Sequence, residues 1–101
     1  MPYILQVDFK QNGPYGKEMY EAYADLAKSI NEEKGFKWKI WAENEETKEV
    51  GGIYLFESKV DAENYLTMHS KRLESYGITE VNGKIFKANE ALTTINGGPM
   101  K

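Results

Sequence analysis

His69 is the only histidine of this chain, and it lies four residues from both Tyr65 and Leu73 in a segment with helical periodicity. This spacing predicts that the imidazole lies on the buried side of a helix. An unperturbed imidazole has a pKa of about 6.5, so His69 is the candidate catalytic base of the chain. The alternative is a core histidine held by one hydrogen bond, because buried titratable groups also serve structural roles.

The composition limits the chemistry further. The chain contains no cysteine, which excludes disulfides, thiolate metal sites and cysteine nucleophiles. One histidine cannot supply a two-histidine iron site or a histidine-rich zinc site within one chain. No glycine-rich dinucleotide fingerprint follows a predicted strand, and no serine has a histidine at a recognisable triad spacing. The sequence therefore predicts no metal and no cofactor.

Aromatic side chains could form a flat pocket next to His69. They come from both strands of a predicted hairpin and from two predicted helices, and tyrosine hydroxyls need polar partners when they are buried. The stretch Asn12-Gly13-Pro14-Tyr15-Gly16 could also present backbone donors at a helix N-terminus to an anionic or oxygen-rich ligand. The alternative is an ordinary aromatic core beside an ordinary loop. The candidate substrate-binding residues are Asn12, Tyr23, Trp38, Tyr54 and Tyr65.

Hydrophobic periodicity predicts the elements that would position these side chains. The first three are a strand over residues 3–9, a helix over 19–30 and a hairpin over 36–56 with its polar turn at 44–48. A second helix begins at a capping box of Ser58 and Asp61 and ends near Gly77. A last strand covers residues 78–88. This order is the ferredoxin-like βαββαβ arrangement of the α+β class. We expect one domain over residues 1–96, with Leu92 and Ile95 as docking residues, and a disordered tail over 97–101.

The hairpin shows an uneven distribution of apolar residues. Alternation predicts that Phe36, Trp38 and Ile40 share the buried face of the first strand, whereas Trp41 falls on the face that carries the charges. The second strand is apolar on both faces, as in an interior strand. Its Gly51-Gly52 pair predicts a bulge, or a place where a ligand or another backbone comes close.

Two helices can cover only one face of such a sheet. The other face would then expose Trp41 together with one apolar set of the second hairpin strand. Because a patch of this kind is rarely left open on a monomer, we expect a second copy of the chain to cover it. The sequence therefore predicts a homodimer.

Composition also bears on other partners. The net charge is -3 and the pI is about 5.2, which argues against a nucleic-acid surface. RNA recognition motifs share the predicted element order, but residues 49–56 lack the basic first residue and the Gly-Phe core of the RNA-binding strand. No apolar run is long enough to span a bilayer. We expect a cytoplasmic protein that binds neither nucleic acid nor membrane.

Several motifs, taken in order, resemble those of one known family over nearly the whole chain. They are Asn12-Gly13-Pro14 with Gly16, the segments at 35–43 and 51–56, His69 with Arg72-Leu73, and the segment at 89–96. This ordered set resembles the YdhR family, whose members are described as mono-oxygenases. That family is similar to the antibiotic-biosynthesis mono-oxygenase superfamily. The resemblance implies a dimeric α/β barrel built from ferredoxin-like subunits.

The resemblance also implies a function. It is cofactor-independent mono-oxygenation of an aromatic or quinol-like small molecule, such as a hydroquinone or an anthrone, with His69 as the base. Trp38, Tyr54 and Asn12 would then be candidate donors to the developing oxyanion. The alternative is a non-catalytic dimer that binds a small apolar ligand in the same pocket. The superfamily is also similar to haem-degrading enzymes that hold haem through a helix histidine. Haem binding or degradation through His69 is therefore a further alternative, which the sequence favours less than the other two.

Overall fold

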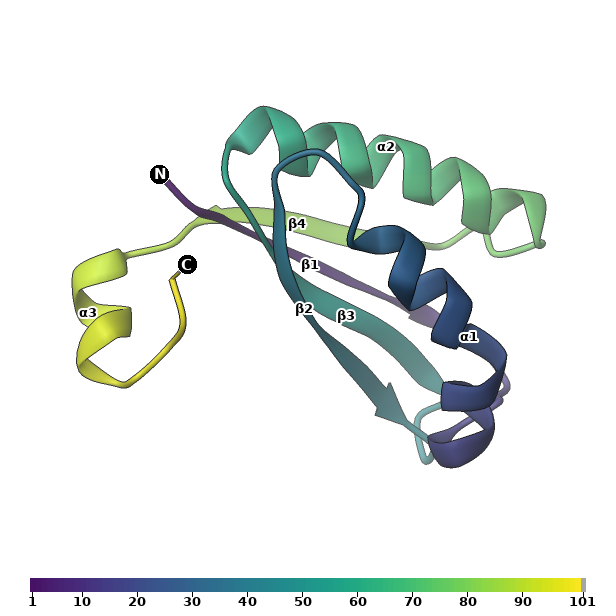
Figure 1. Ribbon diagram of the computed structural model, residues 1–101. Coiled ribbons are helices and arrows are strands. Elements are labelled where there is room, and N and C mark those ends of the chain that lie inside the picture. The colour runs from purple at the N-terminus through teal and green to yellow at the C-terminus, as the bar shows by residue number, and fades with distance from the viewer. Residues whose placement is uncertain (101) are drawn as a thin grey trace.

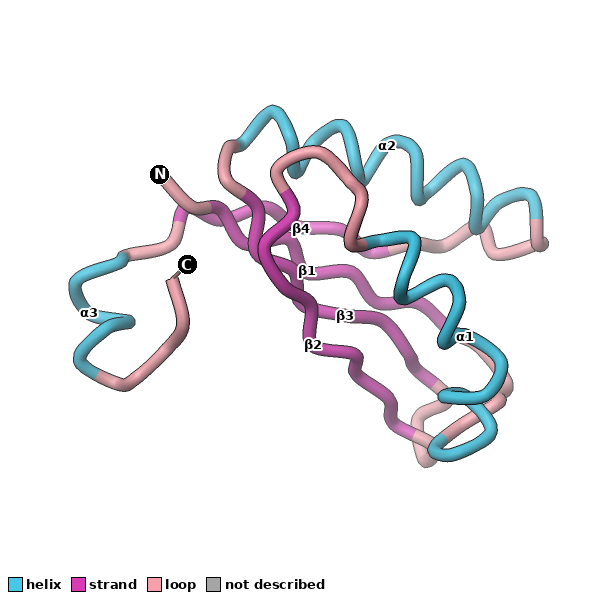
Figure 2. The backbone as a smooth tube through the Cα atoms, in the orientation of Figure 1, coloured by secondary structure: helices cyan, strands magenta, loops and turns pink. Residues whose placement is uncertain are grey.

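The computed structural model describes residues 1–100, which form a ferredoxin-like α+β domain. Its elements are β1 (Tyr3–Lys10), α1 (Gly16–Ile30), β2 (Phe36–Asn44), β3 (Glu49–Phe56), α2 (Lys59–Ser75), β4 (Asn82–Lys87) and α3 (Glu90–Ile95). Their strands form one antiparallel sheet in the order β2-β3-β1-β4 (Figure 2). Both α1 and α2 lie on one face of this sheet (Figure 1). The predicted fold class and element order are confirmed.

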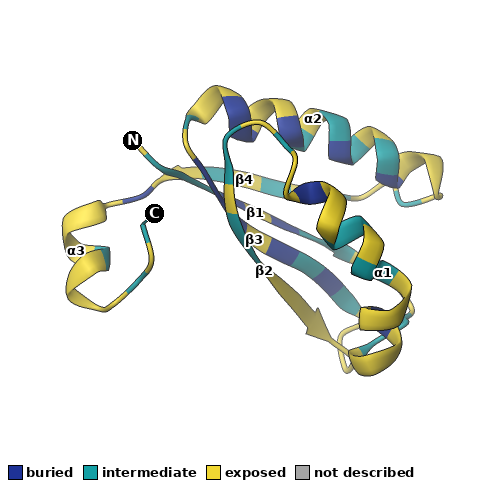
Figure 3. Ribbon diagram, in the orientation of Figure 1, coloured by how far each residue is buried: buried dark blue, intermediate teal, exposed yellow. Residues whose placement is uncertain are grey.

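The face of the sheet that packs against α1 and α2 is called the helix face here, and the opposite face is the open face. The buried residues of α2 form a stripe toward the helix face, at the three- and four-residue spacing of an amphipathic helix (Figure 3). Burial of these apolar side chains holds the helices on the sheet. The core cluster consists of Leu5, Val7, Ile30, Tyr54, Phe56, Ala62 and Tyr65.

The start of α2 follows the predicted capping motif. The side chain of Ser58 accepts a hydrogen bond of 3.1 Å from the backbone N–H of Asp61. This bond satisfies one of the amide groups that the first turn of a helix leaves without an intrahelical partner. The cap therefore sets the first turn of the helix that carries His69.

β2 contains an irregularity that the sequence pattern does not reveal. Phe36 lies opposite Phe56, but Trp38 lies opposite Leu55, so the register shifts between Phe36 and Trp38. Between these two pairs β2 therefore contains one residue more than β3, which is the arrangement of a β-bulge. Because side chains alternate with a period of two, the extra residue moves every later side chain of β2 to the face opposite the expected one.

The bulge corrects the predicted faces of β2. Lys39 lies opposite Tyr54, a core residue, so Lys39 and Trp41 are on the helix face. Trp38 and Ile40 are on the open face, where Ile40 lies opposite Ile53. The expectation that Trp38 and Ile40 are buried under the helices and that Trp41 lies on the open face is wrong.

Gly51 and Gly52 of β3 mark close approaches of their neighbours. A Cβ atom on Gly51 would collide with the backbone carbonyl of Val7 on β1. A Cβ atom on Gly52 would lie 2.5 Å from Cε of Lys39. Of the predicted alternatives for this pair, close approach of another backbone is therefore found, and the bulge lies in β2 instead.

β4 is shorter than predicted. The backbone N–H of Ile78 donates to the carbonyl of Leu73 at 3.0 Å, so Ile78 belongs to the turn that ends α2, and the strand starts only at Asn82. Within β4, Ile85 packs against the core, whereas Phe86 is 47% exposed. The predicted opposition of these two side chains is confirmed.

The segment after β4 differs from the expectation. It forms α3, which lies beyond the end of the sheet, and Leu92 and Ile95 are 62% and 79% exposed rather than docked (Figure 1). Within the expected tail, the carbonyl oxygen of Pro99 accepts a hydrogen bond of 2.9 Å from the indole N–H of Trp38. Lys101 lies outside the described residues. No helix within residues 1–100 has both the length and the apolarity to cross a membrane.

Candidate functional site

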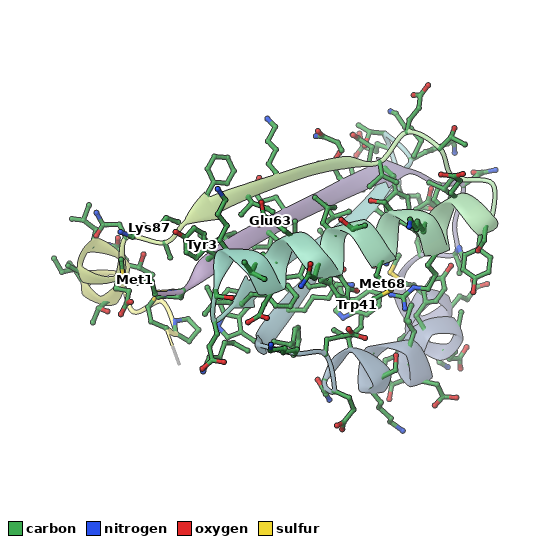
Figure 4. The ribbon with its side chains drawn as sticks, turned by 90° about the horizontal axis from the view of Figure 1, so that it is seen from above. Met1, Tyr3, Trp41, Glu63, Met68 and Lys87 are labelled. Atoms are coloured by element: carbon green, nitrogen blue, oxygen red, sulfur yellow. The ribbon has the colours of Figure 1, made fainter. Side chains whose placement is uncertain are left out.

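A cavity of about 700 Å³ lies between the helix face of the sheet and the two helices α1 and α2. Seen from the helix side, Trp41 lies in the space between these helices (Figure 4). Apolar side chains such as Met19, Leu26 and Leu73 form much of the wall. The volume is within the range of about 300–1,000 Å³ that is typical of small-molecule sites.

Two aromatic rings and one lysine form the β2 side of the cavity. Tyr23 of α1 stacks on Trp41, with ring centroids 6.3 Å apart and an interplanar angle of 16°. Nζ of Lys39 lies 3.3 Å from the centroid of the Trp41 ring and 4.6 Å from that of Tyr54. The absence of a side chain at Gly52 leaves room for the aliphatic part of Lys39. The lysine is thus held inside the cavity, against two ring faces that favour its charged form.

The α2 side of the cavity is a hydrogen-bonded set of side chains. Tyr65, His69 and Arg72 share one side of α2 because residues three and four apart lie next to each other on a helix. Nη2 of Arg72 lies 3.0 Å from Nδ1 of His69 and donates to the hydroxyl of Tyr65 at 3.3 Å. Arginine can only donate, so Nδ1 accepts and the proton of the neutral imidazole is on Nε2. The Tyr65 hydroxyl donates in turn to Tyr54 at 3.4 Å.

This environment shifts the pKa values of both nitrogen bases downward. Burial, with added repulsion from Arg72, lowers the pKa of Lys39 to about 7. Burial, with added repulsion from Arg72 and Lys39, lowers the pKa of His69 to about 4. Burial, with contributions from Tyr65, raises the pKa of Tyr54, so its hydroxyl stays protonated. Near neutral pH the imidazole is therefore neutral, and Lys39 exchanges between amine and ammonium.

The loop before α1 closes one end of the cavity. Asn12 and Gly13 are among the lining residues. The first helical N–H, that of Gly16, donates to Oε1 of Glu43 at 2.9 Å. A carboxylate of the chain itself therefore caps this helix N-terminus, which is a favourable position for negative charge. The amide of Gly16 is thus not free to bind the anionic ligand that the sequence suggested for this loop.

The family of the chain is shown by its sequence. The family model described as "Putative mono-oxygenase ydhR" matches residues 4–99. This chain belongs to the ydhR family. No curated protein matches the sequence of this ydhR-family chain.

A solved structure shares the fold. It is that of a variant of SnoaB, a cofactor-independent oxygenase from Streptomyces nogalater, with a TM-score of 0.58 and 14% sequence identity. The match covers 87% of the ydhR-family chain and 93% of the SnoaB chain. At this level of identity the similarity concerns the fold.

The structure brings together most of the candidate residues of the ydhR-family chain. Asn12, Tyr23, Tyr54 and His69 line the cavity. Tyr65 lies behind this wall, where its ring stacks on His69 with centroids 5.3 Å apart. Trp38 does not line the cavity, because the bulge places it on the open face.

Sequence reasoning did not name Lys39, Trp41 and Arg72 as site residues, although all of them line the cavity. The available signal was Trp41 itself, since a large indole among charged residues indicates that their face is covered. Arg72 could have been found from its position three residues after His69 on a helix. Within residues 1–100 no group of three histidine, cysteine or acidic side chains is arranged to hold a metal ion.

Proposed function

We propose that this ydhR-family protein is a cofactor-independent mono-oxygenase that acts on an aromatic or quinol-like small molecule. The observation that carries the proposal is the position of Lys39, an amine with a pKa of about 7 inside an aromatic cavity that also holds the neutral imidazole of His69. Membership of the ydhR family supports a general oxygenase role. The chain also shares its fold with SnoaB, which is described as a cofactor-independent oxygenase, so this fold is compatible with the proposed class of reaction.

The proposed reaction starts by removing a proton from an acidic C–H or O–H group of the substrate. The resulting anion passes one electron to dioxygen, and recombination of the substrate radical with superoxide forms a carbon–oxygen bond. For an anthrone-like methylene, loss of the second C–H proton then cleaves the peroxide O–O bond and leaves a carbonyl. The second oxygen atom leaves as water with the protons that the protein held. Apolar walls favour this sequence because they limit the access of water to the peroxide.

Lys39 is better suited than His69 to accept the first proton. A general base works best when its pKa is near the pH of the reaction, and that of Lys39 is about 7. The pKa of His69 is about 4, which makes the imidazole a weak base. Its Nδ1 accepts from Arg72, so Nε2 carries the proton that can be donated to a developing oxyanion. We therefore assign the proton transfer to Lys39 and give His69, the candidate base from the sequence, the role of a donor.

We also propose that the protein acts as a homodimer. The open face exposes Ile40 (56%), Ile53 (37%) and Phe86 (47%), and the first two are cross-strand neighbours. An apolar patch on a central strand and its neighbours is a typical subunit interface. A second copy placed there would shield these side chains, and a two-fold axis would make the contact self-complementary.

The function is tested by oxygen uptake. The purified protein, treated with a chelator, is incubated with a panel of anthrones and hydroquinones, and dioxygen consumption is compared with the rate without protein. Isotopically labelled dioxygen should leave one labelled atom in the organic product. Lys39→Met should lower the catalysed rate by about a hundredfold, the lower range for loss of a general base.

Lys37→Met is the matched control, because Lys37 belongs to the same strand but forms only a surface ion pair of 3.7 Å with Glu57. This variant should keep the wild-type rate. Saturable binding of the panel without catalysed oxygen consumption would overturn the oxygenase and favour the non-catalytic ligand-binding dimer. Equal rates for wild type and Lys39→Met would remove Lys39 from the mechanism.

A further inference from the structure

The charges that line the cavity are all of one sign, although the chain as a whole has a net charge of -3. Lys39 and Arg72 come from opposite walls, β2 and α2. Lys10 adds a third positive charge, and it donates to the backbone carbonyl of Thr47. No aspartate or glutamate of residues 1–100 is among the lining residues.

Neither inner cation has a carboxylate partner within the described part of the chain, where the one salt bridge is that of Lys37 with Glu57. Lys39 contacts two ring faces, and Arg72 donates only to neutral acceptors, the Tyr65 hydroxyl and His69. Two such cations repel each other, and removing them from water without a counter-charge is costly. An anionic group placed between them would relieve both costs.

The hydrogen-bonding capacity of Arg72 agrees with this. A guanidinium has five N–H donors, and both contacts recorded for Arg72 use the same nitrogen, Nη2. Donors on the other nitrogens remain available for a planar, oxygen-bearing anion. The neutral His69 can add a donor from Nε2, since Nδ1 is occupied. The rings of Tyr23 and Trp41 would hold the aromatic part of the same ligand.

We propose that the cavity binds aromatic molecules through an anionic oxygen, a carboxylate or an ionised ring hydroxyl, placed between Lys39 and Arg72. The claim that such anions are the substrates rests on the proposed function. The claim that they bind in the cavity depends only on the geometry described above. For an ionisable hydroxyl, transfer of its proton to Lys39 would create the ion pair within the site. A carboxylate beside Lys39 would instead keep the lysine as an ammonium, which cannot accept a proton. A ligand held by a carboxylate therefore fits the binding site alone, and only a ligand with an ionisable hydroxyl also fits Lys39 as the base of the proposed reaction.

The test compares ring systems of the same shape and different charge. Binding of 2-naphthoate and of 2-naphthamide is measured by calorimetry near neutral pH, and 2-naphthol is followed by the absorbance of its ionised form. We expect naphthoate to bind at least about tenfold more tightly than naphthamide, or bound naphthol to ionise at least one pH unit below its value in water, which corresponds to the strength of one charged hydrogen bond. The first result identifies a carboxylate as the source of the anion, and the second a hydroxyl.

Variants locate the site. Lys39→Met and Arg72→Met should each reduce the preference for the anion by about tenfold, whereas Lys37→Met should leave it unchanged. If Arg72→Met fails to fold, Lys39→Met alone decides. Equal binding of naphthoate and naphthamide with no ionisation of naphthol would overturn the proposal. The proposal would also be overturned if none of the three compounds bound at millimolar concentration, or if Lys37→Met lost as much of the preference for the anion as Lys39→Met.

Oxygen uptake separates this inference from the proposed function. Preference for the anion without catalysed oxygen consumption by any ionisable anthrone or hydroquinone would retain the anion site and reject the oxygenase. Catalysed consumption of a substrate that binds as a neutral molecule, in a protein without preference for the anion, would retain the oxygenase and reject the anion site.

Discussion

Lys39 and Trp41 lie on the same face of β2, with Nζ of the lysine 3.3 Å from the centroid of the indole. Both side chains point into the cavity because of the bulge between Phe36 and Trp38. One extra residue in an edge strand of the sheet thus turns the amine of Lys39 and the indole of Trp41 toward the candidate site.

The pH profile of the proposed reaction should distinguish the two nitrogen bases. If Lys39 accepts the proton, its neutral form is required, and kcat/KM should rise with pH around a midpoint near 7. If His69 were the base, the rise would be centred near pH 4. The measurement is the initial rate of oxygen uptake at low substrate concentration across this range. A midpoint near 4 that persists in Lys39→Met would contradict the assignment to Lys39.

Gly51→Ala and Gly52→Ala should have different effects although the residues are adjacent. A methyl group on Gly51 meets the backbone carbonyl of Val7, which cannot move without disrupting β1. We expect Gly51→Ala to lower the free energy of unfolding by roughly 1–3 kcal/mol or more, the usual cost of overpacking. A methyl group on Gly52 would lie 2.5 Å from Cε of Lys39, a flexible side chain that can be displaced, and 3.1 Å from the backbone carbonyl of Ile40, which needs to shift by only a few tenths of an ångström.

Gly52→Ala should therefore remain folded and lose about tenfold in rate and in preference for anionic ligands, because the amine leaves its place over the rings. Urea unfolding measures the first effect, and oxygen uptake with naphthoate binding measures the second. Wild-type rate and wild-type binding in Gly52→Ala would show that the position of Lys39 is unimportant.

Acid should destabilise the protein through His69. The folded pKa of His69 is about 4 and the ordinary pKa of an imidazole is about 6.5, so between these values the unfolded chain binds a proton that the folded chain does not. Stability then falls as the pH falls through this window, by at most about 1.4 kcal/mol per pH unit. His69→Gln, which cannot be protonated, should show a weaker pH dependence of unfolding in urea. Parallel pH dependence in the two proteins would contradict the buried, neutral imidazole.

The proposed homodimer predicts a loss of subunit association when a charge is placed on the open face. Ile53→Lys should shift the protein from dimer to monomer in sedimentation, because a lysine at the centre of an apolar interface has no partner there. Val60→Lys is the matched control, since Val60 is 59% exposed on α2, on the other side of the sheet. A folded wild-type monomer at micromolar concentration would reject the dimer.

The local patterns of the chain were sufficient for the fold and for one wall of the site. The spacing of Ala62, Tyr65, His69 and Leu73 defines the buried side of α2, and the hydroxyl of Ser58 marks its first turn. These features depend on neighbours within about one helical turn, so they can be predicted from the amino-acid order. The burial of His69 on this side of α2 was predictable for the same reason.

The other wall depended on contacts between distant segments. The register of β2 against β3, and with it the faces of Trp38, Lys39 and Trp41, follows from a bulge that no alternation of residue types announces. Likewise, the pKa of Lys39 is lowered by burial under helices and by Arg72, which lies far away in the chain. Periodicity encodes which residues prefer to be buried, whereas burial itself and the electrostatic environment arise only when separate segments pack together.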